Sequence, residues 1–219
     1  FPGLPIFHSK DLVNWEQIGH VLDRPSQLQM KDGLKASNGL WAPTIRYHQG
    51  TYYVICTATG CGGNFFVTAD SPEGPYSEPI FIKDAPGIDP SLFFDEDGTM
   101  WYCGSINGDN KIPPRRYPAE DRIYVQQLDP STGQFIGERH IVSSGYAINS
   151  PYAEAPHIYK IKGKYYLMIA EGGTWENHAV SVFTADNIVG PYTPFICNPV
   201  LTHRHLGNDI DITTIGHAD

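Results

Sequence analysis

Short apolar runs alternate with turns along the whole chain, and no segment carries helical periodicity. Residues 66–70, 123–129 and 183–186 each alternate apolar and polar side chains and end at glycine, proline or aspartate. Such runs, bounded by turn residues, are the pattern of strands and hairpins. No window of a dozen residues places apolar side chains at the 3.6-residue spacing of a helix. The sequence therefore predicts a nearly all-β protein.

One structural unit recurs along the chain. It consists of a first strand, a glycine turn, an aromatic strand, a loop and an outer strand, and it begins at Trp41, Asp89 and Glu154. Each of these residues precedes the glycine of its first turn by the same spacing of nine, and His217 opens a further copy. About four strands in a repeat of 40–60 residues is typical of a β-propeller blade.

The repeat predicts where the first residues of the units meet. The first strand of a blade lines the central channel, so Trp41, Asp89, Glu154 and His217 are expected to converge on one axial site. A structural repeat normally keeps similar residues at equivalent positions because each copy packs alike. Two carboxylates and a tryptophan at one repeat position indicate a shared site, not a shared core.

The spacing also predicts incomplete units at both ends. Each first strand starts about 30 residues before the aspartate of its outer strand, which would place the first unit's start about twenty residues before Phe1. We therefore expect residues 1–219 to be a single domain truncated at both ends, with the end of blade 1, blades 2–4 and the start of blade 5.

Composition narrows the classes of partner. The 219 residues carry a net charge of −9 without a Lys/Arg cluster, which argues against nucleic acid and anionic membranes. No apolar run approaches the roughly 20 residues that span a bilayer, so a soluble protein of undetermined compartment is expected. Thirteen tyrosines in a 12% aromatic share suit sugar ligands. The four cysteines match no zinc spacing, and Cys56 and Cys103 are expected to be buried thiols.

Two carboxylates across a cleft are the minimum chemistry for glycoside hydrolysis. Glu154 begins an apolar strand, and burial would raise its pKa and keep a proton available for a leaving group. The alternative is a glutamate that caps a strand or pairs with an arginine. Asp89 precedes Pro90, so a simple turn is the alternative there.

The other polar and aromatic candidates have weaker support. Trp41 is either core or a platform for a sugar ring. Glu171 ends an apolar strand and is expected behind the site, while residues 95–97 are expected to form a solvated acidic turn. His203 and His205 fit a surface loop better than a metal site.

Several segments in register resemble glycoside hydrolase family 43, most closely its β-xylosidase and α-L-arabinofuranosidase branch. They are residues 1–15, 39–43, 87–93, 154–160 and 216–219. The resemblance runs from end to end and implies a five-bladed β-propeller that hydrolyses with inversion through three carboxyl groups.

The resemblance also implies roles for single residues. Glu154 would be the general acid, and Asp89 would orient it and tune its pKa. Trp41 would line the sugar subsite, and His217 would lie at the channel centre, where some members hold a calcium ion through water. The general base is expected to be absent, since in the family it lies on the first strand of blade 1.

The expected function is removal of xylose or arabinofuranose from xylan- or arabinoxylan-derived oligosaccharides, with no required cofactor and Ca²⁺ as the one candidate ion. The partner is a small carbohydrate, not a nucleic acid or a membrane, and this chain alone is expected to be inactive. The alternatives are a non-catalytic sugar-binding propeller and a protein-interaction propeller. The choice between xylose and arabinose depends on loop shapes and stays open, as do the oligomeric state and a C-terminal β-sandwich.

Overall fold

The computed structural model describes residues 3–106, 114–207 and 209–219, and nearly every regular element among them is a strand. The N-terminal hairpin pairs β1 (Pro5–Ser9) with β2 (Trp15–His20), and η1 (Ala36–Asn38) is a short 3-10 helix. One sheet contains β3 (Leu40–His48), β4 (Thr51–Ala58), β5 (Gly63–Ala69) and β6 (Ile80–Phe81). The next contains β7 (Ile88–Phe94), β8 (Met100–Ile106), β9 (Arg122–Leu128) and β10 (Phe135–Ser143). The last contains β11 (Glu154–Ile161), β12 (Lys164–Glu171), β13 (Ala179–Ala185), β14 (Thr193–Pro194) and β15 (Leu201–Thr202). The all-β prediction is confirmed.

The three larger sheets of the described chain share one antiparallel order, in which each strand pairs with the next along the sequence. In the last sheet β15 adds to β13 beside β14. This order confirms the predicted repeat of four-stranded units. The number of blades in a complete propeller stays a prediction.

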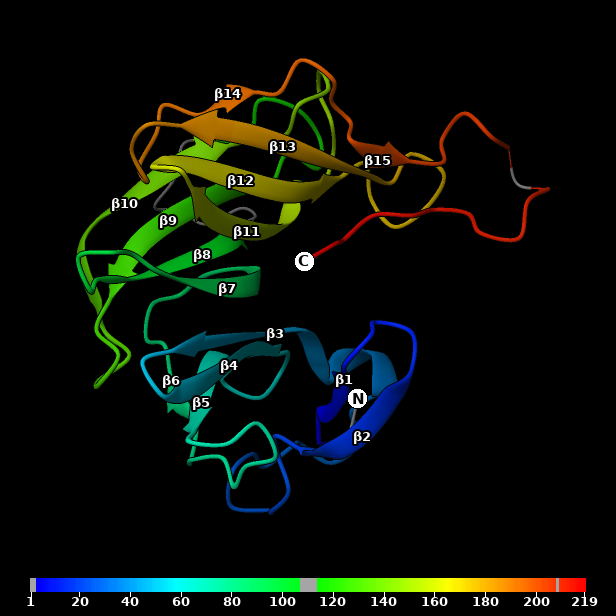
Figure 1. Cartoon of the computed structure of the whole chain (residues 1–219). Coiled ribbons are helices and arrows are strands. Elements are labelled where there is room, and N and C mark those ends of the chain that lie inside the picture. The colour runs from blue at the N-terminus through cyan, green and yellow to red at the C-terminus, as the bar shows by residue number, and fades with distance from the viewer. Residues whose placement is uncertain (1–2, 107–113, 208) are drawn as a thin grey trace.

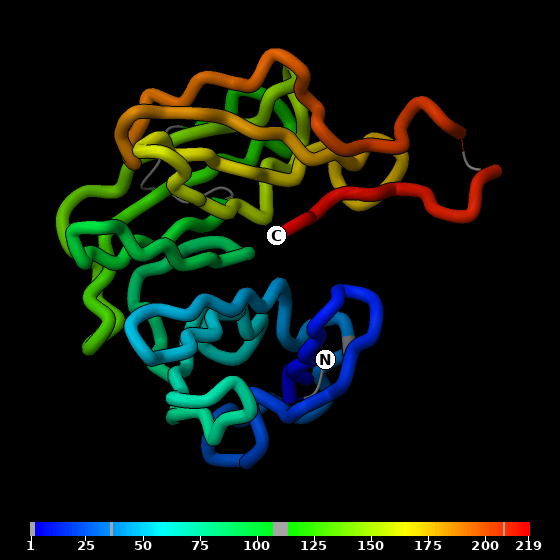
Figure 2. The backbone as a smooth tube through the Cα atoms, viewed as in Figure 1, coloured from blue at the N-terminus to red at the C-terminus, as the bar shows by residue number. Residues whose placement is uncertain are grey.

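The first strands of the three sheets, β3, β7 and β11, lie side by side at the centre of the molecule (Figure 1). The C-terminal segment runs back to the same place (Figure 2). Arg46 of β3 and Tyr159 of β11 both bind the side chain of Asp219 there. The fold thus brings the first strands of the repeats and the C-terminal segment together.

The hydrophobic core lies between neighbouring sheets. Ile55 and Phe66 of one sheet pack with Leu92, Tyr102 and Tyr124 of the next, and all five are fully or almost fully buried. Each of these side chains comes from a different strand. Successive residues of a strand point to opposite faces, so each strand contributes the side chains of one face to this core.

The acidic turn after β7 differs from its prediction. Asp95 is buried and accepts hydrogen bonds from Lys160 Nζ at 2.7 Å and from the Tyr165 hydroxyl at 2.5 Å. Only Glu96 and Asp97 are exposed, as expected. The prediction was wrong for Asp95 because its partners lie on β11 and β12, about 65 residues away in sequence.

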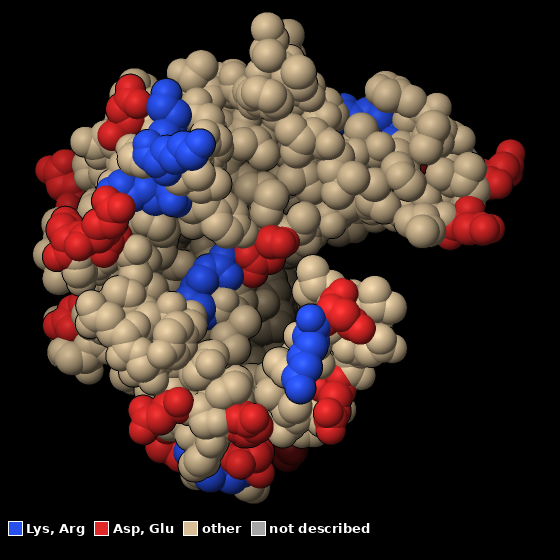
Figure 3. Space-filling model, in the orientation of Figure 1, with Lys and Arg blue, Asp and Glu red and all other residues tan. Residues whose placement is uncertain are grey.

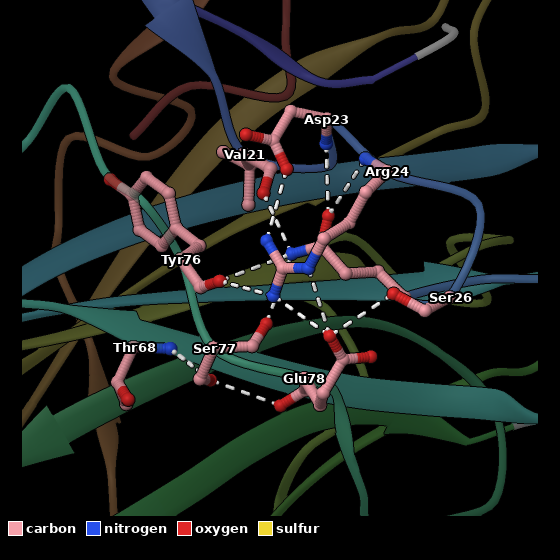
Figure 4. Close-up of polar contacts among 9 residues, drawn as sticks. Val21, Asp23, Arg24, Ser26, Thr68, Tyr76, Ser77 and Glu78 are labelled. Carbon is pink, nitrogen blue, oxygen red and sulfur yellow. Dashed lines mark hydrogen bonds and ion pairs between the residues drawn. The ribbon is translucent and has the colours of Figure 1, made fainter.

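The loop after β2 is fastened to the outer edge of the β3–β6 sheet (Figure 4). Arg24 donates to the Tyr76 carbonyl at 2.7 Å and to Glu78 Oε1 at 2.9 Å. The buried Gln27 donates its amide to the Ser77 carbonyl at 3.0 Å. These bonds satisfy backbone carbonyl groups in the segment between β5 and β6, and they hold the N-terminal hairpin against that sheet.

The four cysteines are free thiols in this structure. Cys56 of β4 and Cys103 of β8 are buried, as predicted. Burial raises the pKa of Cys56 to about 12, so this thiol stays protonated and inert at neutral pH.

The charged side chains form small mixed groups on the face shown in Figure 3, which is hollowed between its upper and lower parts. The Lys and Arg side chains that gather at the upper left are flanked by acidic ones, and the net charge of the chain is −9. Within the described ranges, no helix is long and apolar enough to cross a membrane.

Candidate active site

Each of the three inner strands carries the same irregularity near its start. The pairing register shifts after Trp41 in β3, after Ile88 in β7 and after Glu154 in β11. The next residue has a positive φ in every case, and these residues are Ala42 at 45°, Asp89 at 55° and Ala155 at 48°. A bulge of this kind bends a strand and redirects its side chains.

The bulges correct the predicted register by one residue. His217, with a φ of 54°, shares the left-handed conformation of Asp89, whereas Trp41 and Glu154 occupy the preceding position. The equal spacing to the turn glycine was misleading, because the turn between β7 and β8 spans residues 95–99. The corresponding turns of the other two sheets contain two residues each.

Asp89 and His217 are brought together in a cavity of about 220 Å³ between the inner strands. The remaining lining comes from the same strands and the C-terminal end, and consists of Ala42, Pro43, Thr44, Ala155, His157 and Asp219. Glu154 adjoins this cavity, because the backbone N–H of Ala155 donates to Asp89 Oδ2 at 3.2 Å. The two predicted carboxylates are thus neighbours in the fold.

Glu154 has the electrostatics expected of a proton donor. Burial raises its pKa to about 7, and the nearby carboxyl groups of Asp89 and Asp121 contribute in the same direction. The pKa of Asp89 is also raised by burial, which the charge of His217 and the Ala155 N–H partly oppose. Several carboxyl groups that share a poorly solvated site cannot all ionise easily, so one of them keeps its proton near neutral pH.

Asp121 is a site residue that the sequence reasoning missed. It is buried immediately before β9, where Arg115 donates to its Oδ1 at 2.7 Å, and burial raises its pKa. Its only sequence signal is a pair of acidic residues directly before an apolar strand. Spacing could not reveal it, because the third strand of a unit does not begin at the repeat position.

A charged network on the far wall of the cavity was also missed. Arg46 binds Asp219 through both terminal nitrogens, at 3.0 and 2.7 Å, and the Tyr159 hydroxyl donates to the same carboxylate at 2.7 Å. Burial lowers the pKa of His157 to about 4, so its imidazole is neutral at neutral pH. Its Nδ1 can then accept from Arg46, 3.0 Å away. This network joins β3, β11 and the C-terminal segment.

His217 depends on a close approach between Gly216 and His178. The His178 ring lies directly over Gly216, and a Cβ there would stand 2.4 Å from it. His178 Nδ1 also hydrogen-bonds the Thr214 carbonyl at 2.9 Å. Only glycine allows this contact, which fixes the segment that carries His217 into the cavity.

The remaining candidates lie outside the cavity. Trp41 is 39% exposed, so it is not core, and its indole N–H donates to the Ser37 carbonyl at 2.7 Å. Glu171 is buried, and its carboxylate accepts from the backbone of Tyr146 and Ala147 and from the Ser181 hydroxyl. Glu171 thereby supports the loop before β11.

The described residues contain no group of three His, Cys, Asp or Glu side chains that could hold a metal ion. His203 and His205 lie in the loop after β15. Ca²⁺ takes about six to eight oxygen ligands, and the Asp219 carboxylate is already bound by Arg46 and Tyr159. A directly ligated calcium ion therefore does not fit this site.

The chain is similar to known glycosidases over its whole length. It is 44% identical over 220 residues to a "Xylosidase/arabinosidase" of Butyrivibrio fibrisolvens, covering 100% of this chain and 42% of that protein. It is 40% identical to "Non-reducing end alpha-L-arabinofuranosidase BoGH43B" of Bacteroides ovatus, covering 100% of this chain and 39% of that protein. The chain thus spans about two fifths of the length of these relatives.

Solved structures show the same relationship. A GH43_12 protein retrieved from a capybara gut metagenome superimposes with a TM-score of 0.90 at 41% identity, covering 100% of this chain and 41% of that one. Xylan beta-1,4-xylosidase from Bacillus halodurans gives a TM-score of 0.86 at 35% identity, with coverages of 99% and 41%. The family described as "Glycosyl hydrolases family 43" matches residues 1–219 in full. The chain belongs to glycosyl hydrolase family 43.

Proposed function

We propose that the protein carrying these residues hydrolyses O-glycosidic bonds and releases xylose or arabinofuranose, with inversion, from xylan-derived oligosaccharides. The observation that supports this most is Glu154, with a pKa of about 7, beside the buried carboxyl of Asp89. The named xylosidases and arabinosidases among the relatives point to these two sugars. In the same proposal, the three sheets are blades of a five-bladed propeller.

Glu154 acts as the general acid in this proposal. Near neutral pH the Glu154 carboxyl is protonated in a large fraction of the molecules. This proton passes to the glycosidic oxygen as the bond to the anomeric carbon breaks. Water attacks the opposite face of the sugar and gives its proton to a general base. Inversion requires that base to stand roughly 6.5–9.5 Å from the acid. We assign the base to no described residue.

Asp89 acts on the acid and not on the substrate. Its carboxylate accepts from the Ala155 N–H and so fixes the backbone next to Glu154. Its charge also raises the pKa of Glu154. The first effect fixes the backbone that carries the acid, and the second keeps the proton of Glu154 available.

Substrate contacts are assigned to Trp41 and His217. The exposed face of Trp41 offers a surface for the C–H side of a sugar, and His217 lines the cavity beside Asp89. No cofactor is required. A hydrated Ca²⁺ would fit the cavity, which has room for about seven waters at about 30 Å³ each. His217 would hold it through water, and the buried Thr44 hydroxyl, which has no partner among the described residues, would bind one of those waters.

The test is hydrolysis by the Glu154→Gln variant of two substrates that differ in leaving group. On xylobiose or an arabinoxylo-oligosaccharide the variant should lose about 10²–10⁴-fold in rate, because the leaving oxygen needs a proton. On a nitrophenyl glycoside, whose leaving group needs little protonation, the loss should be much smaller. Equal losses on both would remove Glu154 from the acid's role. Sugar binding without any hydrolysis by the complete protein that carries these residues would favour a non-catalytic sugar-binding protein.

A further inference from the structure

Two aromatic side chains lie at the same end of the last sheet as Glu154. Tyr152 precedes Glu154 by two residues, and Trp175 lies in the loop after β12, whose Ala170 pairs with Glu154. The two loops are joined, because the Gly172 N–H donates to the Pro151 carbonyl at 2.9 Å. The hairpin of β11 and β12 therefore continues past the acid and carries the two rings.

The two rings are held in place although Trp175 is exposed and Tyr152 is only partly buried. Their centroids are 5.5 Å apart at an interplanar angle of 81°, an edge-to-face contact. The Trp175 ring lies over Gly173, where a Cβ would stand 2.7 Å from it, and the Trp175 carbonyl accepts from the His178 N–H at 2.9 Å. Even so, Trp175 remains 46% exposed. A fixed, half-exposed indole presents a flat apolar face to solvent.

This face is close to the proposed chemistry. Two residues of extended chain span at most about 7 Å, so the backbone of Tyr152 lies within that distance of Glu154. The cavity with Asp89 and His217 is lined by Ala155, the residue next to Glu154. A substrate chain bound at Glu154 therefore lies within reach of the exposed Trp175 and of the partly buried Tyr152 beside it.

We propose that Tyr152 and Trp175 form the subsite for the leaving group, with Trp175 stacking on a xylopyranose ring. This inference rests on the proposed function, in which Glu154 protonates the oxygen of the leaving group. Xylopyranose is the leaving group whether xylose or arabinofuranose is released from such oligosaccharides. All its hydroxyls are equatorial in the chair form, so both ring faces present C–H groups to an aromatic side chain.

The test compares a substrate that fills this subsite with one that leaves it empty. Trp175→Ala should lower kcat/KM on xylotriose about tenfold, the size expected for loss of one aromatic contact. Its kcat/KM on xylosyl fluoride should not change, because fluoride brings no sugar to the subsite. Trp175→Phe should restore most of the activity on xylotriose. Equal losses on both substrates, or no loss on xylotriose, would overturn the proposal.

Trp15 provides a matched control. It is 56% exposed on the N-terminal hairpin, away from β11 and β12. Trp15→Ala should therefore leave kcat/KM unchanged on both xylotriose and xylosyl fluoride. Thermal melts of each variant separate a folding defect from a subsite defect. If the complete protein that carries these residues hydrolyses neither substrate, the proposed function fails. Xylotriose titrations followed by tryptophan fluorescence then decide the subsite alone, since Trp175→Ala should weaken binding about tenfold and Trp15→Ala should not. Equal affinity of the wild type, Trp175→Ala and Trp15→Ala for xylotriose would overturn the proposed subsite.

Discussion

Replacing Glu154 by glutamine should stabilise the fold, and the gain should depend on pH. Glutamine has the shape of the protonated acid but never carries a charge. In the unfolded chain the Glu154 carboxyl loses its proton near its ordinary pKa of 4.5, whereas in the folded protein burial raises that pKa to about 7. Above pH 4.5 the wild type must therefore either keep a proton or bury a charge on folding, and the variant does neither.

The magnitude follows from the interval between the two pKa values. One pKa unit corresponds to about 1.4 kcal/mol, so the raised pKa costs the wild type about 3 kcal/mol of unfolding free energy at pH 8. Below pH 4.5 the carboxyl is protonated in both states and the cost vanishes. It grows as the pH rises from 4.5 to 7 and is constant above. Glu154 is partly exposed, so screening by solvent makes 3 kcal/mol an upper value.

Urea unfolding at pH 4, 6 and 8, followed by tryptophan fluorescence, measures this difference. Glu138, an exposed residue of β10, gives the control variant Glu138→Gln, which should match the wild type at every pH. A carbon-13 titration of the Glu154 carboxyl checks the same quantity directly. A stability gain that is the same at all three pH values, or a carboxyl midpoint near 4.5, would refute the reasoning.

Three further outcomes are expected. Asp89→Asn removes a charge that raises the pKa of Glu154, so the basic limb of the pH–rate profile should move to lower pH; a shift upward would contradict this. Gly216→Ala places a Cβ against the His178 ring and should lower stability by about 1–3 kcal/mol in urea melts, and adding His178→Ala should recover part of the loss. Asp95→Asn weakens two hydrogen bonds to a buried carboxylate and should cost about 2 kcal/mol, whereas an unchanged unfolding midpoint would show that the turn is solvated after all.

The strands, the repeat and the candidate carboxylates Glu154 and Asp89 could be predicted from the sequence alone. Alternation of apolar and polar residues depends only on the period of a strand, and the turn residues between the runs have local backbone preferences. Both signals can therefore be read without knowing any long-range contact. Glu154 and Asp89 followed from the repeat, because equivalent strands begin near a common axis.

The register of the strands at that axis, and the groups around each candidate, depend on long-range contacts that the sequence does not reveal. Asp89 shares its position with His217 and not with Glu154, because bulge conformation and turn length vary between units that look alike in sequence. The environments of Asp95 and Asp121 also required the fold. Whether a polar side chain is solvated, paired or shifted in pKa depends on the groups around it in space. For Asp219, which binds Arg46 across 173 residues of sequence, no local pattern carries that information.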